Sequence, residues 1–154
     1  MVDLVKISLR APRDEDRNFG FAVKKAAMRP YIEPAWGWDE AFQVEYHRQD
    51  WVKQRPQIIT LDGADIGTIE IVRGEIGFHL GEFYLLPAYQ RQGIGLHLMT
   101  ALLRDADAAG LPIRLEVFRV NPVQSLYLRC GFRVTGEFKT HYRMERAPMP
   151  AVQP

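Results

Sequence analysis

A short glycine-containing segment has residue types that suit it to bind a phosphate group. It reads Gln90-Arg91-Gln92-Gly93-Ile94-Gly95 and lies between an apolar strand and a long amphipathic run, so we expect a sharp strand-to-helix turn. The first N–H groups of a helix lack intrahelical partners and carry about half a unit of positive charge, which favours phosphate oxygens. Each glycine costs a helix about 1 kcal/mol relative to alanine. Two glycines in the first turn therefore indicate that a ligand approaches the backbone closely.

The hydrophobic pattern predicts the elements that position this segment. Alternation and β-branched runs predict strands at Val5–Leu9, Arg55–Leu61, Asp65–Val72, Glu75–Leu86, Ile113–Phe118, Phe132–Glu137 and Thr140–Arg146. Apolar residues at helical spacing predict helices at Asp14–Met28, Trp38–Trp51, Gln90–Ala109 and Ser125–Cys130. Asp62-Gly63 predicts a two-residue hairpin turn. Pro30, Pro34 and Gly37 are expected to break the chain into a loop between the first two helices.

This order of elements predicts an α+β fold, or a mixed α/β layered one. The connection from the Glu75–Leu86 strand through the long helix to the Ile113–Phe118 strand should be parallel and right-handed. At 154 residues the chain suffices for one domain with its own core, which we place at residues 1–146. The remaining residues, 147–154, include three prolines and are expected to form a disordered tail.

Composition narrows the class of partner. The net charge of +1 argues against a dedicated binder of nucleic acid or of a membrane surface. No apolar stretch approaches the roughly 20 residues that span a bilayer, and the amino-terminal residues lack the apolar core of a signal peptide. The single cysteine, Cys130, permits no internal disulfide, which fits a cytoplasmic protein. We expect Cys130 to be a small buried hydrophobe rather than a nucleophile.

Two patterns on the expected elements resemble those of the GNAT superfamily of acetyl-CoA-dependent N-acetyltransferases. The first is the family's pyrophosphate motif, Gln/Arg-x-x-Gly-x-Gly/Ala after a strand, which Gln90–Gly95 matches. The second is an Asn after the next strand, a Tyr on a short helix and then Gly-Phe, which stand here as Asn121, Tyr127 and Gly131-Phe132. The likeness covers about Leu61 to Met144, and the earlier residues match only in their two-helix outline. It implies a splayed mixed sheet of about seven strands, flanked by about four helices.

The resemblance implies that acetyl-CoA, or coenzyme A, binds as a cosubstrate and that no metal is needed. The N–H groups from Gln92 to Gly95 would hold its pyrophosphate, and Arg91 would add a charge-assisted contact. The backbone of Leu85 and Leu86 would pair with the pantetheine arm like an added strand. Asn121 would donate or accept a hydrogen bond with the same arm.

The resemblance also implies that Tyr127 is the general acid. Attack on the thioester expels a thiolate whose conjugate thiol has a pKa of roughly 8.5, and a nearby phenol can donate a proton to it. For an isolated tyrosine on an amphipathic turn, a place in the core is the simpler interpretation. Asn121 and Gly131-Phe132 on either side of Tyr127 favour the functional one.

An amine acceptor has to lose a proton before it attacks, because its pKa is about 10.4. In the resembling family such bases lie on the strand before the pyrophosphate segment, where Glu82 and His79 are the polar candidates. Because they are an odd number of positions apart, a regular strand points their side chains to opposite faces. Only one of them then faces the acceptor, unless a bulge intervenes. Glu82 is preferred slightly, since a carboxylate in an apolar strand needs solvent or a function. Glu116, and more weakly His141 and Tyr142, are further candidates to line the acceptor side.

The acceptor groove implied by the resemblance is built from the first two helices, their loop and the last two strands. That loop, Arg29–Glu40, carries Tyr31, Trp36 and Trp38, which suit an apolar or cation-binding wall but also suit packing against the body. Its acidic residues, Glu33, Asp39 and Glu40, could attract an ammonium group. We expect a small-molecule or peptide amine as acceptor, no nucleic acid or membrane as partner, and a chain compatible with a homodimer.

Two other function classes fit parts of the sequence. One is a binding module that senses acyl-CoA without turnover, against which Tyr127 argues. The other is a mononucleotide-binding domain. It is disfavoured because Gln90–Gly95 contains no Lys and no Ser or Thr follows to hold a metal. The leading hypothesis is therefore direct transfer of an acetyl group from acetyl-CoA to an amine.

Overall fold

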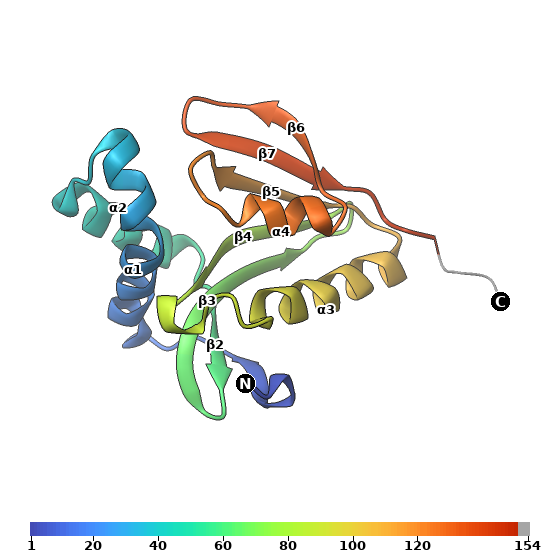
Figure 1. The fold of residues 1–154 in the computed structure, drawn as a ribbon, viewed down its shortest axis with the longest axis horizontal. Coiled ribbons are helices and arrows are strands. Elements are labelled where there is room, and N and C mark those ends of the chain that lie inside the picture. Colours follow the sequence, from blue (N-terminus) through green and yellow to red (C-terminus); the bar gives the residue numbers. More distant parts are fainter. Residues whose placement is uncertain (151–154) are drawn as a thin grey trace. The chain divides into compact units, whose positions relative to one another are not determined.

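The structure is a computed structural model that describes residues 1–150 (Figure 1). Seven strands in these residues form one mixed sheet, in the order β1-β2-β3-β4-β5-β7-β6. The strands are β1 (Ile7–Arg10), β2 (Gln57–Leu61), β3 (Ala64–Arg73), β4 (Phe78–Leu85), β5 (Ile113–Phe118), β6 (Arg133–Glu137) and β7 (His141–Arg146). The α-helices are α1 (Asp16–Trp36), α2 (Glu40–Lys53), α3 (Ile94–Ala109) and α4 (Gln124–Arg129). Short 3-10 helices lie at Leu4–Lys6 (η1) and Pro87–Tyr89 (η2).

This arrangement confirms the predicted mixed fold and the predicted order of its main elements. Two compact units share the sheet. The first comprises Met1–Glu70 and Glu82–Gln92, and the second comprises Ile71–Gly81 and the chain from Gly93 onward. Strands β3 and β4 contribute residues to both units.

The first unit contains an antiparallel arrangement of β1, β2 and the first part of β3. The β2–β3 turn has positive φ at both Asp62 (51°) and Gly63 (84°), as a type I′ hairpin requires. Ile58, Ile59 and Ile66 are fully buried, and because the adjacent Ile58 and Ile59 point to opposite faces, this part of the sheet is covered on both sides. The hairpin was therefore correctly predicted from Asp62-Gly63.

Helix α1 is longer than the sequence predicts. It continues through Pro30 and Pro34 to Trp36, so the expectation of a loop from Arg29 was wrong. A proline has no N–H, which removes one intrahelical hydrogen bond at each position and costs about 3 kcal/mol in a helix interior. The helix persists because both prolines lie on its exposed side, while Met28 and Ile32 on the other side are buried.

The second unit contains α3, whose predicted apolar stripe is buried. Its members are Ile94, Leu98, Met99, Leu102 and Ala106. The helix ends at Gly110, which adopts a left-handed conformation with φ of 68°, as predicted. β4 pairs in parallel with β5 over three residues, from Phe78–Leu80 to Ile113–Leu115, which confirms the predicted parallel crossover. β5 and β6 each pair antiparallel with β7.

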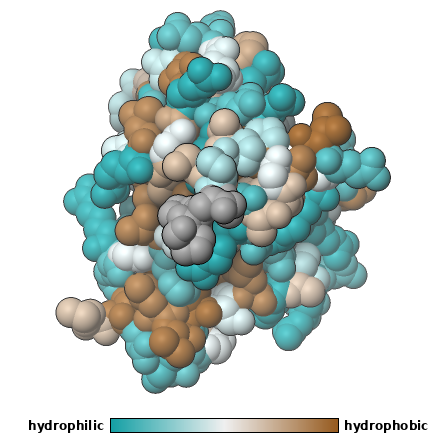
Figure 2. Space-filling view, turned by 90° about the vertical axis from the view of Figure 1, so that its right-hand side faces the viewer, coloured by the Kyte–Doolittle hydropathy of each residue, from teal (hydrophilic) through white to brown (hydrophobic). Residues whose placement is uncertain are grey.

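No helix in residues 1–150 is both long and apolar enough to cross a membrane. The face shown in Figure 2 is mostly hydrophilic, with separate hydrophobic patches. Part of the predicted tail, residues 151–154, lies outside the described residues. Within the described part, the Met149 N–H donates to Asp107 Oδ1 at 2.9 Å.

An ion-pair network joins β1, α1 and β3 in the first unit. Arg10 donates two hydrogen bonds to Asp16, at 2.8 and 2.9 Å, and two to Asp65, at 3.2 and 2.9 Å. Asp16 is buried, and the Arg10 guanidinium is the largest cause of the fall in its pKa to about 2.

We expect Arg10→Met to lower the free energy of unfolding by about 3 kcal/mol, because it leaves a buried carboxylate without its cation. Urea denaturation at pH 7 measures this. The Asp16 contribution is present above its unfolded pKa near 3.8 and is lost as pH falls through about 2. Arg48→Met is the matched control, since Arg48 pairs only with exposed Glu45 and little change is expected. Equal losses in the two variants would contradict the prediction.

Candidate active site

The predicted phosphate segment forms a strained turn followed by an uncapped helix. α3 begins at Ile94 rather than at Gln90, and Gly93 is its N-cap with φ of 82°. Gly93 therefore lies outside the helix, where only glycine adopts that conformation easily, and its presence does not by itself indicate a ligand. Gly95 remains in the first turn. No side chain caps the helix, so its first N–H groups are available to an anion.

Arg91 also has an unusual backbone conformation in this turn. It has φ of 61°, which is uncommon for a residue with a side chain. Arg91, Gln92 and Gly93 are all exposed. Backbone in left-handed conformations turns successive N–H groups toward one side and forms anion-binding concavities. The turn thus has the geometry and charge that a phosphate requires.

Two glutamine side chains hold the turn in place. Gln90 Nε2 donates to the Leu85 carbonyl at 2.9 Å, and Gln92 Nε2 donates to the Ala88 carbonyl at 2.7 Å. Both residues were predicted to bind the ligand because they belong to the motif, and these side-chain bonds were not predicted. Their side-chain nitrogens stabilise the turn, so their backbone groups and side-chain oxygens remain for a ligand.

The backbone at the end of β4 is partly occupied. Leu86 N–H donates to the Ile66 carbonyl at 2.9 Å, and the Leu86 carbonyl accepts from Tyr89 N–H at 2.8 Å. Because backbone groups point to alternate sides of a strand, those of Leu85 face away from β3. Since the Leu85 carbonyl accepts from Gln90 Nε2, the strand-like pairing expected of Leu85 and Leu86 is narrowed to the N–H of Leu85.

Glu82, on β4, has a carboxyl group whose pKa is raised. Its Oε1 atom is buried and forms no hydrogen bond to the described residues. Burial raises its pKa to about 7, and the nearby Glu70 and Asp50 carboxylates add to the rise. Lys24 and Thr68 act in the opposite direction. A carboxyl with such a pKa can accept a proton near neutral pH, as expected of a general base.

His79, the alternative base, lies in a different environment in the second unit. Its Nε2 is 2.7 Å from Oε2 of Glu116, and both side chains are 42% exposed. Arg143 Nε lies 3.8 Å from the other oxygen of Glu116. The three side chains form an exposed charged row on β4, β5 and β7, which is common on a solvated sheet face. His79 thus lacks the burial that sets Glu82 apart.

Tyr127, on α4, is 4% exposed and packs against Phe132, with ring centroids 5.6 Å apart. Burial raises the pKa of its phenol well above the usual value, so the hydroxyl keeps its proton. A protonated hydroxyl can donate a hydrogen bond or a proton, but the raised pKa makes it a weaker acid than an ordinary phenol, and the packing against Phe132 also fits the alternative of a core aromatic. Cys130 is partly buried, and burial raises the pKa of its thiol, which disfavours a nucleophilic role.

The connection between β5 and α4 is fixed by side-chain amides. Asn121 Oδ1 accepts from Val123 N–H at 2.9 Å. Gln124 Nε2 donates to the carbonyls of Phe118 (3.1 Å), Arg119 (2.8 Å) and Asn121 (3.1 Å). Gln124 was not predicted from the sequence, because its three acceptors lie on a turn that only the folded chain forms. Because the Asn121 oxygen is engaged, its contact to a ligand would fall to the amide nitrogen.

The acidic residues expected to attract an amine are mostly paired. Glu40 accepts from Lys25 (2.7 Å) and from Trp38 Nε1 (2.6 Å). Asp39 caps α2 by accepting from Phe42 N–H at 3.0 Å. Glu33 pairs with Arg29. These contacts therefore do not favour a role for the three residues in attracting the ammonium group of an acceptor.

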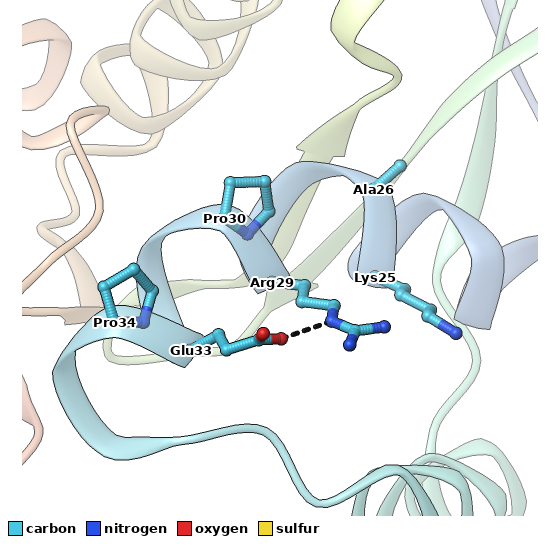
Figure 3. A pocket seen from close by; sticks show the side chains of 6 residues that line it. All are labelled: Lys25, Ala26, Arg29, Pro30, Glu33 and Pro34. Atoms are coloured by element: carbon cyan, nitrogen blue, oxygen red, sulfur yellow. Dashed lines mark hydrogen bonds and ion pairs between the residues drawn. The ribbon is translucent and has the colours of Figure 1, made fainter.

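A shallow groove of about 460 Å³ runs along the exposed side of α1 (Figure 3). It is lined by Lys25, Ala26, Arg29, Pro30, Glu33 and Pro34. Figure 3 shows the two prolines beside one another on the helix, with the Arg29–Glu33 pair across from them. Tyr31 and Trp36, expected in a loop, instead belong to this helix.

Comparisons of the sequence and of the structure with known proteins point to one family. A sequence profile described as an acetyltransferase (GNAT) domain matches residues 53–134. No curated protein matches the chain. A PaiA N-acetyltransferase from Thermoplasma acidophilum, solved with coenzyme A, is 22% identical, covers 92% of this chain and 98% of its own, and has a TM-score of 0.72.

Two further solved structures share the fold. The ribosomal-protein-S18-alanine N-acetyltransferase from Escherichia coli is 18% identical, covers 94% of this chain and 96% of its own, and has a TM-score of 0.65. Ard1 from Thermoplasma volcanium is 19% identical, covers 94% and 99%, and has a TM-score of 0.64. At these identities the likeness concerns the fold, while the profile covers more than half of the chain. The chain therefore belongs to the GNAT acetyltransferase family and is an acyltransferase that uses acetyl-CoA.

Proposed function

We propose that this protein transfers the acetyl group of acetyl-CoA to a primary amine by direct attack within a ternary complex. The acceptor is a small molecule or a peptide. The single observation that carries the proposal is the Glu82 carboxyl, whose burial gives it a pKa of about 7. A carboxyl group with this pKa is partly ionised at neutral pH. It can therefore take a proton from an amine and later release it to solvent.

The residues present fit the cosubstrate. The first N–H groups of α3, at Gly93, Ile94 and Gly95, would hold the pyrophosphate, with Arg91 as a cationic neighbour. The outward N–H of Leu85 and the amide of Asn121 would hold the pantetheine arm. In this arrangement the chain binds its cosubstrate mainly through backbone groups.

The proposed reaction balances with two protein groups. The amine nitrogen bonds to the thioester carbon while its proton passes to Glu82, directly or through a water. The carbon–sulfur bond then breaks, and Tyr127 gives its proton to the departing sulfur. The products are an amide and the free thiol of coenzyme A, and proton exchange with solvent restores both side chains.

Release of free thiol from acetyl-CoA tests the proposal. The assay uses a panel of polyamines, amino acids, amine antibiotics, and peptides with a free amino terminus or a lysine. We expect thiol release that requires an amine, with the acetylated product identified by mass spectrometry. Calorimetric binding of coenzyme A without turnover on any amine would instead support a sensing module.

Two substitutions of Arg91 separate the effect of its charge on binding from the effect of its backbone strain on stability. Arg91→Ala removes one charge–phosphate contact, and we expect about tenfold weaker binding of coenzyme A. Arg91→Gly should lose the same affinity but gain about 1 kcal/mol in stability, because glycine adopts the left-handed conformation without strain. Calorimetry and urea denaturation measure the two effects. Unchanged affinity in both variants would remove Arg91 from the binding site.

A further inference from the structure

Helix α4, which carries Tyr127, is too short to be stable by itself. It comprises the 6 residues Gln124–Arg129, and its N-cap residue, Val123, makes no side-chain capping bond. Isolated helices shorter than about 12–15 residues are marginal in water, so contacts with the rest of the chain must hold this one in place. Two side chains with no part in the mechanism described above make such contacts. They are Gln124 at the start of α4 and Arg146 at its end.

Gln124 ties the start of α4 to the end of β5. Its Nε2 donates to the carbonyls of Phe118, Arg119 and Asn121 at 3.1, 2.8 and 3.1 Å. Because an amide nitrogen carries two hydrogens, the three carbonyls share them. Phe118 is the last residue of β5, so these bonds join the helix directly to the sheet.

Arg146, the last residue of β7, joins the end of α4 to α3. Its side chain is buried, and its Nε donates to the Cys130 carbonyl, just after α4, at 3.2 Å. Its two terminal nitrogens donate to the two carboxylate oxygens of Asp107, on α3, at 2.7 and 3.1 Å. The guanidinium is planar and its donors form a rigid fork. The carbonyl and the carboxylate are therefore held in one fixed arrangement.

The contact at Cys130 is close to the backbone of Tyr127. The N–H groups of Cys130 and Phe132 both donate to the Tyr127 carbonyl at 3.0 Å. Gly131 lies between them with φ of 93°, and Arg146 Nε is 3.8 Å from the position that a Cβ atom would occupy on this glycine. The guanidinium thus packs against the turn that fixes the Tyr127 backbone.

We propose that Arg146 and Gln124 are positioning residues for Tyr127, which hold α4 at its two ends. In the proposed function, α3 begins at the groups that bind the pyrophosphate, and α4 carries the proton donor. The relation between the two helices therefore sets the distance from the phenol to the departing sulfur, and the bonds of Arg146 to Cys130 and Asp107 fix that relation. This inference rests on the proposed role of Tyr127 as the acid.

Fluorine NMR tests the inference without turnover. The protein is labelled with 3-fluorotyrosine, and the Tyr127 signal is the one absent in Tyr127→Phe. We expect Arg146→Met and Gln124→Met each to shift or broaden the Tyr127 signal, because each releases one end of α4. The signals of Tyr31 and Tyr46, on α1 and α2, should not change.

Steady-state kinetics separates positioning from a general structural role. We expect Arg146→Met and Gln124→Met each to lower kcat by about tenfold, because a small misplacement of a catalytic group is costly. In the Tyr127→Phe background the same substitutions should lower kcat by less than about twofold, since the hydroxyl that they position is already absent. An equal loss of kcat in both backgrounds would show that the two residues do not act through Tyr127, and would overturn the inference.

Two further variants control for charge and for stability. Arg114→Met removes a different ion pair between β5 and β7, in which Arg114 Nε lies 3.2 Å from Glu145 Oε2 and the arginine side chain is 55% exposed. Both the kcat and the Tyr127 signal of this variant should equal those of the wild type. Arg146→Lys keeps a cation for Asp107 but lacks the rigid fork that also reaches Cys130. It should therefore regain part of the stability lost in Arg146→Met, as measured by urea denaturation, without regaining kcat.

The outcomes for the two ends of α4 are independent. Gln124→Met decides the question if Arg146→Met fails to fold, because Gln124 is only partly buried. A Tyr127 signal and a kcat equal to those of the wild type in every folded variant would overturn the inference. Absence of thiol release by wild-type protein would contradict the proposed function instead.

Discussion

Tyr127→Phe is expected to lower kcat by about 10²-fold or more, while the affinity for coenzyme A changes by less than about twofold. The substitution removes only the hydroxyl. The phenylalanine ring keeps the packing against Phe132, so the fold around α4 should be maintained. Burial keeps the phenol of Tyr127 protonated across the working pH range, and the variant therefore lacks its donor at every pH tested.

Steady-state thiol release and calorimetry with coenzyme A measure these two effects. The thermal midpoint of the variant provides the control, because a purely structural tyrosine would change stability and leave kcat alone. Loss of stability with an unaltered kcat would assign Tyr127 to the core. An unaltered kcat with unaltered stability would equally remove Tyr127 as the acid.

Glu82→Gln is expected to lower kcat/KM by about 10²–10⁴-fold at pH 7.5, the usual contribution of a general base. It should also abolish the limb of the pH–rate profile that rises through about pH 7, the pKa of this carboxyl. Glutamine has the same shape but accepts no proton. His79→Asn is the matched comparison, because His79 is the other polar candidate of β4. If His79→Asn removed the limb and Glu82→Gln retained it, the base would be His79.

The same substitution should make the protein more stable. Because the folded state holds the Glu82 proton more tightly than the unfolded state, stability falls as pH rises from about 4.5 to about 7. A shift of this size corresponds to about 3 kcal/mol above pH 7. Glu82→Gln should therefore gain up to that amount at pH 8 and nothing at pH 4, as measured by urea denaturation. If Glu82→Gln gained no stability at pH 8, the folded state would not penalise the ionised Glu82 carboxylate.

Several features of this protein could be predicted from local sequence because local interactions decide them. Asp62-Gly63 specifies its hairpin, since the turn demands positive φ at both positions. The apolar stripe of α3 and its end at Gly110 follow from helical period and from the left-handed preference of glycine. The Gln90–Gly95 motif likewise located the turn before α3. Each of these depends on residues a few positions apart.

Other features required the tertiary structure. The prolines of α1 predict a break, but burial of Met28 and Ile32 carries the helix past them. Gln90 occupies a position of the motif, yet its side chain donates a hydrogen bond to the Leu85 carbonyl of the preceding strand. Lys24 and Thr68 lower the pKa of Glu82 from elements far apart in the chain, and nothing in their local sequence marks them.

The sequence by itself determined the family, the order of the elements and the identity of the candidate acid and base. Only the tertiary structure decided that the Glu82 carboxyl is buried, with its pKa raised to about 7, whereas His79 lies on an exposed face beside Glu116. The physical reason is that a pKa depends on desolvation and on charges brought close by folding, whereas spacing along the chain records neither.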